Sequence, residues 1–146
     1  MRKLVLLVCS CIVLIAPLAS VAQDTDAGSK AVPPIIAIGM RAYKGSGPDA
    51  AIQAWIKGGP LDGDPGALNE ANTLHQIQDS YGAYQSFHVL ATRNLDPRAS
   101  ILYLIMNFEK GPLFAKFVVY RSADTWIVTD FDFNTKEEAI LPASLQ

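Results

Sequence analysis

The chain has 146 residues, with 12 lysines and arginines against 14 aspartates and glutamates, and a formal net charge of −2 at pH 7. A chain of this length fits one domain with a substantial hydrophobic core. Its basic residues form no cluster, which argues against nucleic acid and anionic membrane as partners.

The N-terminus has the layout of a secretory signal peptide. Residues 2–3 are basic, and residues 4–16 form an almost continuous apolar run. Pro17 ends the run, and the small residues at 20–22 suit cleavage by a signal peptidase. The run is shorter than the ~20 residues that span a bilayer. We therefore interpret 1–22 as a cleaved signal, which predicts an exported protein, either periplasmic or secreted.

Cleavage would remove both cysteines, Cys9 and Cys11. Taking 22 residues from 146 leaves 124, and losing two basic residues changes the net charge from −2 to −4. The mature chain then has no disulfide and no thiolate metal site, so its stability must come from its core. We expect no cofactor and no metal, because His75 and His88, the two histidines, have no pattern of acidic ligands around them.

Residues 23–32 are small and polar, and we expect them to form a disordered lead-in. A first helix is predicted after Pro33-Pro34, because proline suits a helix start. The helix is expected to end at Gly45 or Gly47, since glycine is common just after a helix. Gly39 weakens the helical pattern in its middle.

Two further helices have clear start and stop signals. The second is predicted to begin at Pro48 and to end at Gly58-Gly59-Pro60. The third is predicted to begin at Asp64-Pro65, where the aspartate can cap the helix and the proline can open its first turn. Gly82 is expected to end it.

From Tyr84 the apolar period changes from helical to two, which predicts a strand closed by Asp96-Pro97. In regular alternation, Phe87, Val89 and Ala91 lie on one face of this strand. His88 then points to the opposite face, where a solvent-exposed position is the expected one.

Three more strands complete the predicted fold. Residues 101–108 are apolar on both faces, which is typical of a central strand covered on both sides. Strands at 113–121 and 125–133 follow it after turn signals. The fold class is α+β: three N-terminal helices packed in a curved four-stranded antiparallel sheet, over residues 33–136. Residues 137–146 are expected to form a C-terminal tail.

The last predicted strand breaks its own alternation. Trp126 and Val128 share one face of a regular strand, whereas Phe131 and Phe133 fall on the other. One bulge near Thr129-Asp130 would bring all four side chains inside and place the aspartates on either side of Phe131 outside. Bulges also increase the twist of a strand, which favours a sheet that curls.

The segments Tyr81-Gly82-x-Tyr84, GPLFAKFVVYRSADTW (111–126) and FDFN (131–134) resemble the nuclear transport factor two-like superfamily of cystatin-like α+β cones. The resemblance covers most of 33–136 and is closest to small exported bacterial members of unassigned function. The superfamily includes steroid isomerases, dehydratases, polyketide cyclases and protein-binding modules. The resemblance therefore implies a cone-like fold and leaves the activity open.

In enzymes of that superfamily a buried aspartate or histidine works inside the cone, opposite a tyrosine or a second acid. The resemblance makes His75, Asp79, Tyr84 and Tyr103 the candidate catalytic residues. A surface position is the alternative for His75, which falls beside the apolar stripe of its helix. No catalytic pair emerges, so we expect a protein that is not an enzyme.

The predicted sheet is rich in aromatic residues, and Phe117, Trp126 and Tyr103 are the candidates for ligand binding. This pattern predicts an exported module that binds a partner protein or a small apolar ligand. The alternative is a small-molecule isomerase, dehydratase or cyclase that uses His75 or Asp79 with Tyr84 or Tyr103.

A third hypothesis is a structural subunit that dimerises through the outer face of the sheet. Ile105, Phe114 and Val118 would form an exposed apolar patch there. The acidic residues near the C-terminal end are expected to form a solvated edge that discourages sheet-to-sheet pairing, and they are Asp130, Asp132, Glu137 and Glu138.

Overall fold

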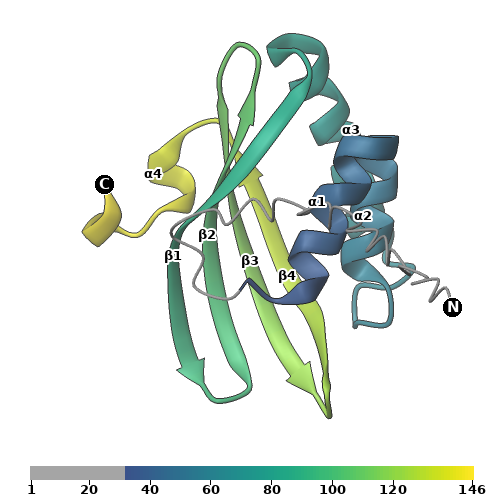
Figure 1. Cartoon of the computed structure of the whole chain (residues 1–146), viewed down its shortest axis with the longest axis vertical. Helices are drawn as coiled ribbons and strands as arrows, with labels where there is room; N and C mark the ends of the chain where they lie inside the picture. The colour runs from purple at the N-terminus through teal and green to yellow at the C-terminus, as the bar shows by residue number, and fades with distance from the viewer. Residues whose placement is uncertain (1–31) are drawn as a thin grey trace, which may run out of the picture.

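The computed structural model describes residues 32–146, whose arrangement is shown in Figure 1. They form an α+β domain in which three helices precede a four-stranded antiparallel sheet, as the sequence predicts. Each strand pairs with the next one in the chain, in the order β1-β2-β3-β4. The predicted signal peptide and all but the last residue of the lead-in lie outside the described residues.

Each N-terminal helix begins with a proline: α1 (Pro34–Ser46), α2 (Pro48–Ile56) and α3 (Pro65–Tyr81). Gly47 follows α1 with φ 86° and Gly82 follows α3 with φ 84°, a left-handed conformation that glycine adopts without strain. Asp64 caps α3, because its Oδ1 accepts a hydrogen bond from the Ala67 N–H at 2.8 Å. These local signals place the three helices as predicted.

α1 and α2 meet closely at Gly39. The indole of Trp55, on α2, lies across this glycine and donates its N–H to the Ile36 carbonyl oxygen at 3.3 Å. A β-carbon at position 39 would overlap the indole ring. The glycine that weakens the helical pattern in the sequence is therefore the place where the fully buried Trp55 ring fits.

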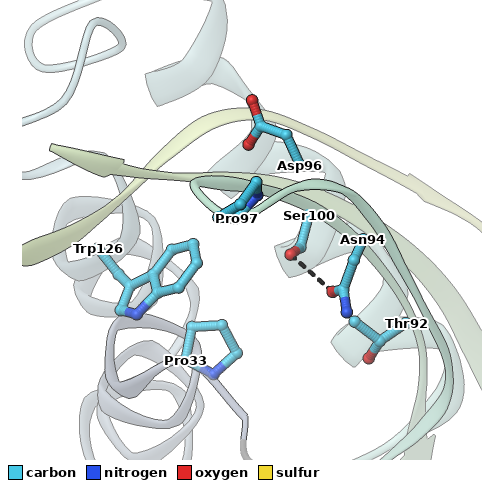
Figure 2. A pocket seen from close by; sticks show the side chains of 7 residues that line it. All are labelled: Pro33, Thr92, Asn94, Asp96, Pro97, Ser100 and Trp126. Carbon is cyan, nitrogen blue, oxygen red and sulfur yellow. Dashed lines mark hydrogen bonds between the residues drawn. The ribbon is translucent and has the colours of Figure 1, made fainter.

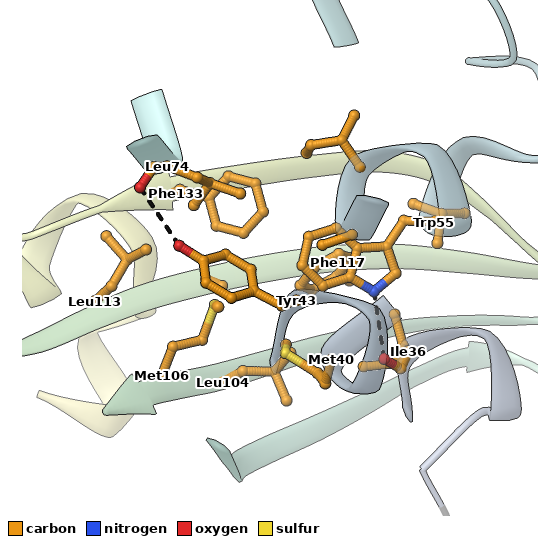
Figure 3. Packing of buried hydrophobic residues seen from close by; sticks show 14 of the residues in the cluster. Ile36, Met40, Tyr43, Trp55, Leu74, Leu104, Met106, Leu113, Phe117 and Phe133 are labelled. Carbon is orange, nitrogen blue, oxygen red and sulfur yellow. Dashed lines mark hydrogen bonds between the residues drawn. The ribbon is translucent and has the colours of Figure 1, made fainter. Parts of the chain in front are cut away.

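The sheet is formed by β1 (Tyr84–Asp96), β2 (Ala99–Phe108), β3 (Pro112–Ser122) and β4 (Thr125–Asn134). α1, α2 and α3 cover one face, called the inner face here, and α4 (Glu137–Ile140) lies on the opposite, outer face (Figure 1). The main core fills the space between the helices and the inner face (Figure 3). Phe117 lies at its centre, with its ring 4.9 Å from that of Trp55 and 5.7 Å from that of Phe133.

The predicted bulge in β4 is confirmed. Val118 lies opposite Asp130, whereas Val119 lies opposite Val128, so Thr129 is the extra residue. Its hydroxyl donates to the Val118 carbonyl oxygen at 3.2 Å. Val128 is buried in the core, and Trp126, Phe131 and Phe133 pack against or within the same cluster, while Asp130 and Asp132 are exposed.

β1 is less regular than its sequence pattern indicates. Its pairing with β2 shifts at three places, and at the middle one Val89 pairs with Leu104 while Ala91 pairs with Tyr103. Leu90 is therefore an extra residue. The prediction that Ala91 shares a face with Val89 is wrong, because this bulge turns Ala91 to the outer face, where it packs beside Tyr103.

The segment after β4 folds back onto the outer face and includes α4 and a 3₁₀ turn, η1 (Ala143–Leu145). Ile140 and Leu141 are buried in a second cluster with Tyr103 and Phe114. β2 is thus covered on both faces, as its uninterrupted apolar sequence predicts.

The expected apolar patch on the outer face is not exposed as a whole. Phe114 retains only 9% of its surface because it packs with Ile140 and Leu141, and Ile105 and Val118 are half-buried. The acidic edge is exposed as expected, over Asp130, Asp132, Glu137 and Glu138.

Candidate functional site

The histidine and aspartate of the candidate catalytic set lie on the helical surface. His75 Nε2 is 2.6 Å from Asp49 Oδ2, and both side chains are largely exposed. This contact joins α3 to the first turn of α2, where an acidic residue also complements the helix dipole. Asp79 is exposed one turn further along α3. The contact that His75 makes therefore links α3 to α2.

Tyr84 lies at the start of β1, in an aromatic cluster at the inner face. Its ring centroid is 4.9 Å from that of Tyr43 and 5.8 Å from that of Phe108, and its hydroxyl contacts Met40 Sδ at 3.7 Å. Burial raises the pKa of Tyr84 to about 12. Burial and then the neighbouring Tyr84 raise the pKa of Tyr43 well above its usual range. Both phenols stay protonated at neutral pH, which suits packing better than proton transfer.

The three candidate ligand-binding residues are divided between the two faces of the sheet. Phe117 is fully buried in the core. Tyr103 lies on the outer face, where it lines a hollow of about 360 Å³ with Thr92, Arg93, Leu145 and neighbouring residues of β1 and the C-terminal segment. Thr92, on the edge strand, also lines the cavity beside Trp126. Trp126 is half-buried at the inner face and lines this larger cavity. Phe117 and Trp126 therefore belong to the same inner-face cluster, and Tyr103 lies on the opposite face of the sheet.

The cavity beside Trp126, called the inner cavity, has a volume of about 440 Å³ and is open to solvent. It lies at the end of the sheet formed by the β1–β2 hairpin and the start of β4, next to the start of α1 (Figure 2). Its lining consists of Pro33, Thr92, Asn94, Asp96, Pro97, Ser100 and Trp126.

The β1 bulge decides which side chains face this cavity. Beyond Leu90 the pairing brings Thr92 opposite Leu102 and Asn94 opposite Ser100, so the polar residues of β1 and β2 share the inner face. Ser100 retains only 7% of its surface, and its hydroxyl lies 3.0 Å from Asn94 Oδ1 as a donor. The inner cavity therefore has a wall of uncharged hydrogen-bonding groups.

The hairpin turn beside the cavity is held by several contacts. Asp96 Oδ1 accepts a hydrogen bond from the Arg98 N–H at 2.7 Å. Arg98 Nε donates to the Arg121 carbonyl oxygen at 3.1 Å, and its guanidinium lies 4.9 Å from the centre of the Tyr120 ring. These contacts tie the β1–β2 turn to β3, so the polar wall is positioned before any ligand arrives.

The chemistry of the inner cavity favours binding. Asp96 is the single titratable residue among those that line it, and no lysine or arginine lines it. General acid–base catalysis is carried out by titratable side chains positioned against the substrate. Trp126 offers a flat apolar surface, and Thr92, Asn94 and Ser100 offer hydrogen bonds, a combination that is typical of small-molecule sites.

Among the residues that line the inner cavity, Trp126 is the one that the sequence predicts to bind a ligand. The polar lining residues Thr92, Asn94 and Ser100 are not predicted from the sequence, because regular alternation from Val89 would place the first two on the outer face. A signal was nevertheless present, since three small polar residues flank the Asp96-Pro97 turn at a point where both strands change from apolar to polar.

Within residues 32–146, no group of three or more histidine, cysteine, aspartate or glutamate side chains is placed to hold a metal ion. Among the helices of that same range, none has both the length and the apolar character needed to cross a membrane. Family models, curated proteins and solved structures were all compared with this chain, and none of them matches it.

Proposed function

We propose that this chain is an exported, non-enzymatic domain with a nuclear transport factor two-like, cone-shaped fold that binds a small ligand in the inner cavity. The observation that carries the proposal is the composition of that cavity. Trp126 and two prolines face the polar side chains of the β1–β2 hairpin around about 440 Å³. Ligand pockets commonly measure ~300–1,000 Å³ and combine apolar walls with a few polar groups.

The other parts of the proposal have separate support. The basic start, apolar run and small residues of 1–22 support export. Three helices followed by an antiparallel meander, with a bulge in β4 that bends the strand, support the cone-like fold.

The alternative of an isomerase, dehydratase or cyclase has less support. His75 pairs with Asp49 on the helical surface, and Tyr103 lies on the outer face. Tyr84 has its pKa raised to about 12. None of these residues lines the inner cavity. A general acid or base must lie within hydrogen-bond reach of the substrate.

Native mass spectrometry tests the proposal on protein recovered from expression of the whole chain. We expect a non-covalent adduct with the mass of a small molecule in the wild type, and its loss in Trp126→Ala. Leu68→Ala is the matched control, because it truncates an exposed apolar side chain on α3, which is not part of the inner cavity.

Thermal-shift screening against a metabolite library covers ligands that are lost during purification, since a ligand that binds only the folded state raises its stability. A wild-type protein without an adduct, and without any stabilisation that depends on Trp126, would contradict the proposed function.

A further inference from the structure

Several hydrogen-bonding groups beside the inner cavity are available to bind a ligand. Within residues 32–146, the Thr92 hydroxyl, Asn94 Nδ2 and Trp126 Nε1 have no hydrogen-bond partner. Asn94 Oδ1 accepts from the Ser100 hydroxyl, which leaves the NH₂ group of the amide to donate. A purely apolar ligand would bury these groups unpaired, which is unfavourable.

The charges of the residues that line the inner cavity argue against a charged ligand. An anion would find no lysine or arginine there and would meet the Asp96 carboxylate instead. That carboxylate also offers little to a cation, since Oδ1 already accepts from the Arg98 N–H and the group points away from the space between Trp126 and Asn94 (Figure 2). An uncharged ligand fits this wall best.

The opposite wall is apolar and flat. Trp126 and Pro33 lie side by side across from Asn94 and Thr92 in Figure 2. A ring with an apolar face could pack on the indole, and hydroxyl groups at its edge could exchange hydrogen bonds with the hairpin. Only a ligand with an apolar ring face and hydroxyl groups at its edge can pack on the indole and also form hydrogen bonds with the hairpin.

On the basis of the proposed binding function, we infer that the ligand is an uncharged, hydroxylated ring, the chemistry of a small saccharide. Its C–H face packs on Trp126. Its hydroxyls accept from Asn94 Nδ2 and exchange a hydrogen bond with Thr92. This assigns specificity to residues of the β1–β2 hairpin, which the bulge at Leu90 turns toward the cavity.

Acrylamide quenching of tryptophan fluorescence tests the inference directly. The chain has two tryptophans, and Trp55 is fully buried, so the quenchable emission comes from Trp126. A printed glycan array identifies the saccharide probes, and those that bind are then titrated together with glucose, N-acetylglucosamine and cellobiose. We expect at least one saccharide to protect Trp126 in a saturable manner.

Two threonine variants test whether the polar side chains of the hairpin recognise the hydroxyl groups of the ligand. Thr92→Val keeps the shape of the side chain and removes a hydroxyl that has no partner in residues 32–146, so it should leave folding intact. It should weaken the binding of the saccharide by about three- to tenfold. Thr73→Val, on α3, makes the same change away from the cavity and should leave the binding unchanged.

Toluene and choline serve as the apolar and cationic probes. Saturable protection of Trp126 by either of them, with none by any saccharide, would overturn the hydroxylated ring and leave the proposed binding function standing. Equal saccharide binding in the wild type and in Thr92→Val would also overturn the inferred recognition. No protection by any probe, combined with no adduct in native mass spectrometry, would overturn both the inference and the proposed function.

Discussion

Gly39 lets α1 and α2 approach until the Trp55 indole covers the backbone of α1. The resulting contact buries Trp55 completely and places its N–H on the Ile36 carbonyl oxygen. Trp55 also contacts Phe117 on β3, so one glycine affects how both helices sit on the sheet. A side chain added at position 39 should therefore disturb the packing of both helices against the sheet.

Gly39→Ala should therefore destabilise the protein by about 1–3 kcal/mol, because the added methyl group forces the Trp55 ring to move within a packed core. Gly45→Ala is the matched control in the same helix. Nothing lies within 4 Å of a β-carbon at position 45, so this change should be neutral or stabilising by up to ~1 kcal/mol. Urea unfolding measures both, and equal effects would contradict the packing role of Gly39.

Tyr43 and Tyr84 make stability depend on alkaline pH. Both have a raised pKa in the folded protein, so the folded state holds these protons more firmly than the unfolded chain does. Their contribution is complete below the usual tyrosine pKa of about 10 and is lost as pH rises through the folded values. The free energy of unfolding should fall above that pH, by at most about 1.4 kcal/mol per pH unit for each tyrosine.

Urea unfolding at a series of pH values measures this slope. The double variant Tyr43→Phe with Tyr84→Phe should flatten it, and Tyr120→Phe, outside the pair, should leave it as in the wild type. A slope that persists in the double variant would show that other groups control the alkaline transition.

At the scale of elements, the three helices were predictable because their ends carry local signals. Proline at the first turn and glycine after the last act within a few residues, and the Asp64 cap reaches only to Ala67. The bulge in β4 was also predictable, because the large aromatic residues on either side of it cannot share the core without it.

The irregularity of β1 was not predictable in the same way. Leu90 is apolar, and a regular strand accommodates it as well as a bulged one does, so nothing local reveals the shift. The inner cavity depends on that shift, which explains why its polar wall was missed while Trp126 was found. The sequence predicts a C-terminal tail at 137–146 but not its packing on the outer face, because its short apolar stretch acquires a partner only once the sheet has formed.

The C-terminal segment should contribute to stability through its contact with the outer face. Replacing the buried Ile140 and Leu141 by alanine should cost about 2–5 kcal/mol in total, since both pack against Phe114 and Tyr103. Leu145→Ala, at a position that retains 40% of its surface, should cost much less. Urea unfolding tests the stability.

Sedimentation velocity shows whether uncovering the outer face of the sheet in that double variant causes self-association. A double variant as stable as Leu145→Ala would mean that the segment does not cover the outer face in solution.

At the scale of the whole molecule, the sheet is covered unequally on its two faces. The helices bury the middle of the inner face, and the C-terminal segment covers part of the outer face. The end of the inner face that carries Trp126 and the β1–β2 hairpin remains open to solvent as a cavity. A stable core beside a separate, partly polar hollow suits the binding function proposed above.

A crystal structure of the protein with its retained or added ligand locates the binding site. We expect the ligand in the inner cavity, against Trp126 on one side and against Thr92 and Asn94 on the other. A ligand in the outer hollow beside Tyr103 and Leu145, with the inner cavity filled only by water, would contradict this expectation.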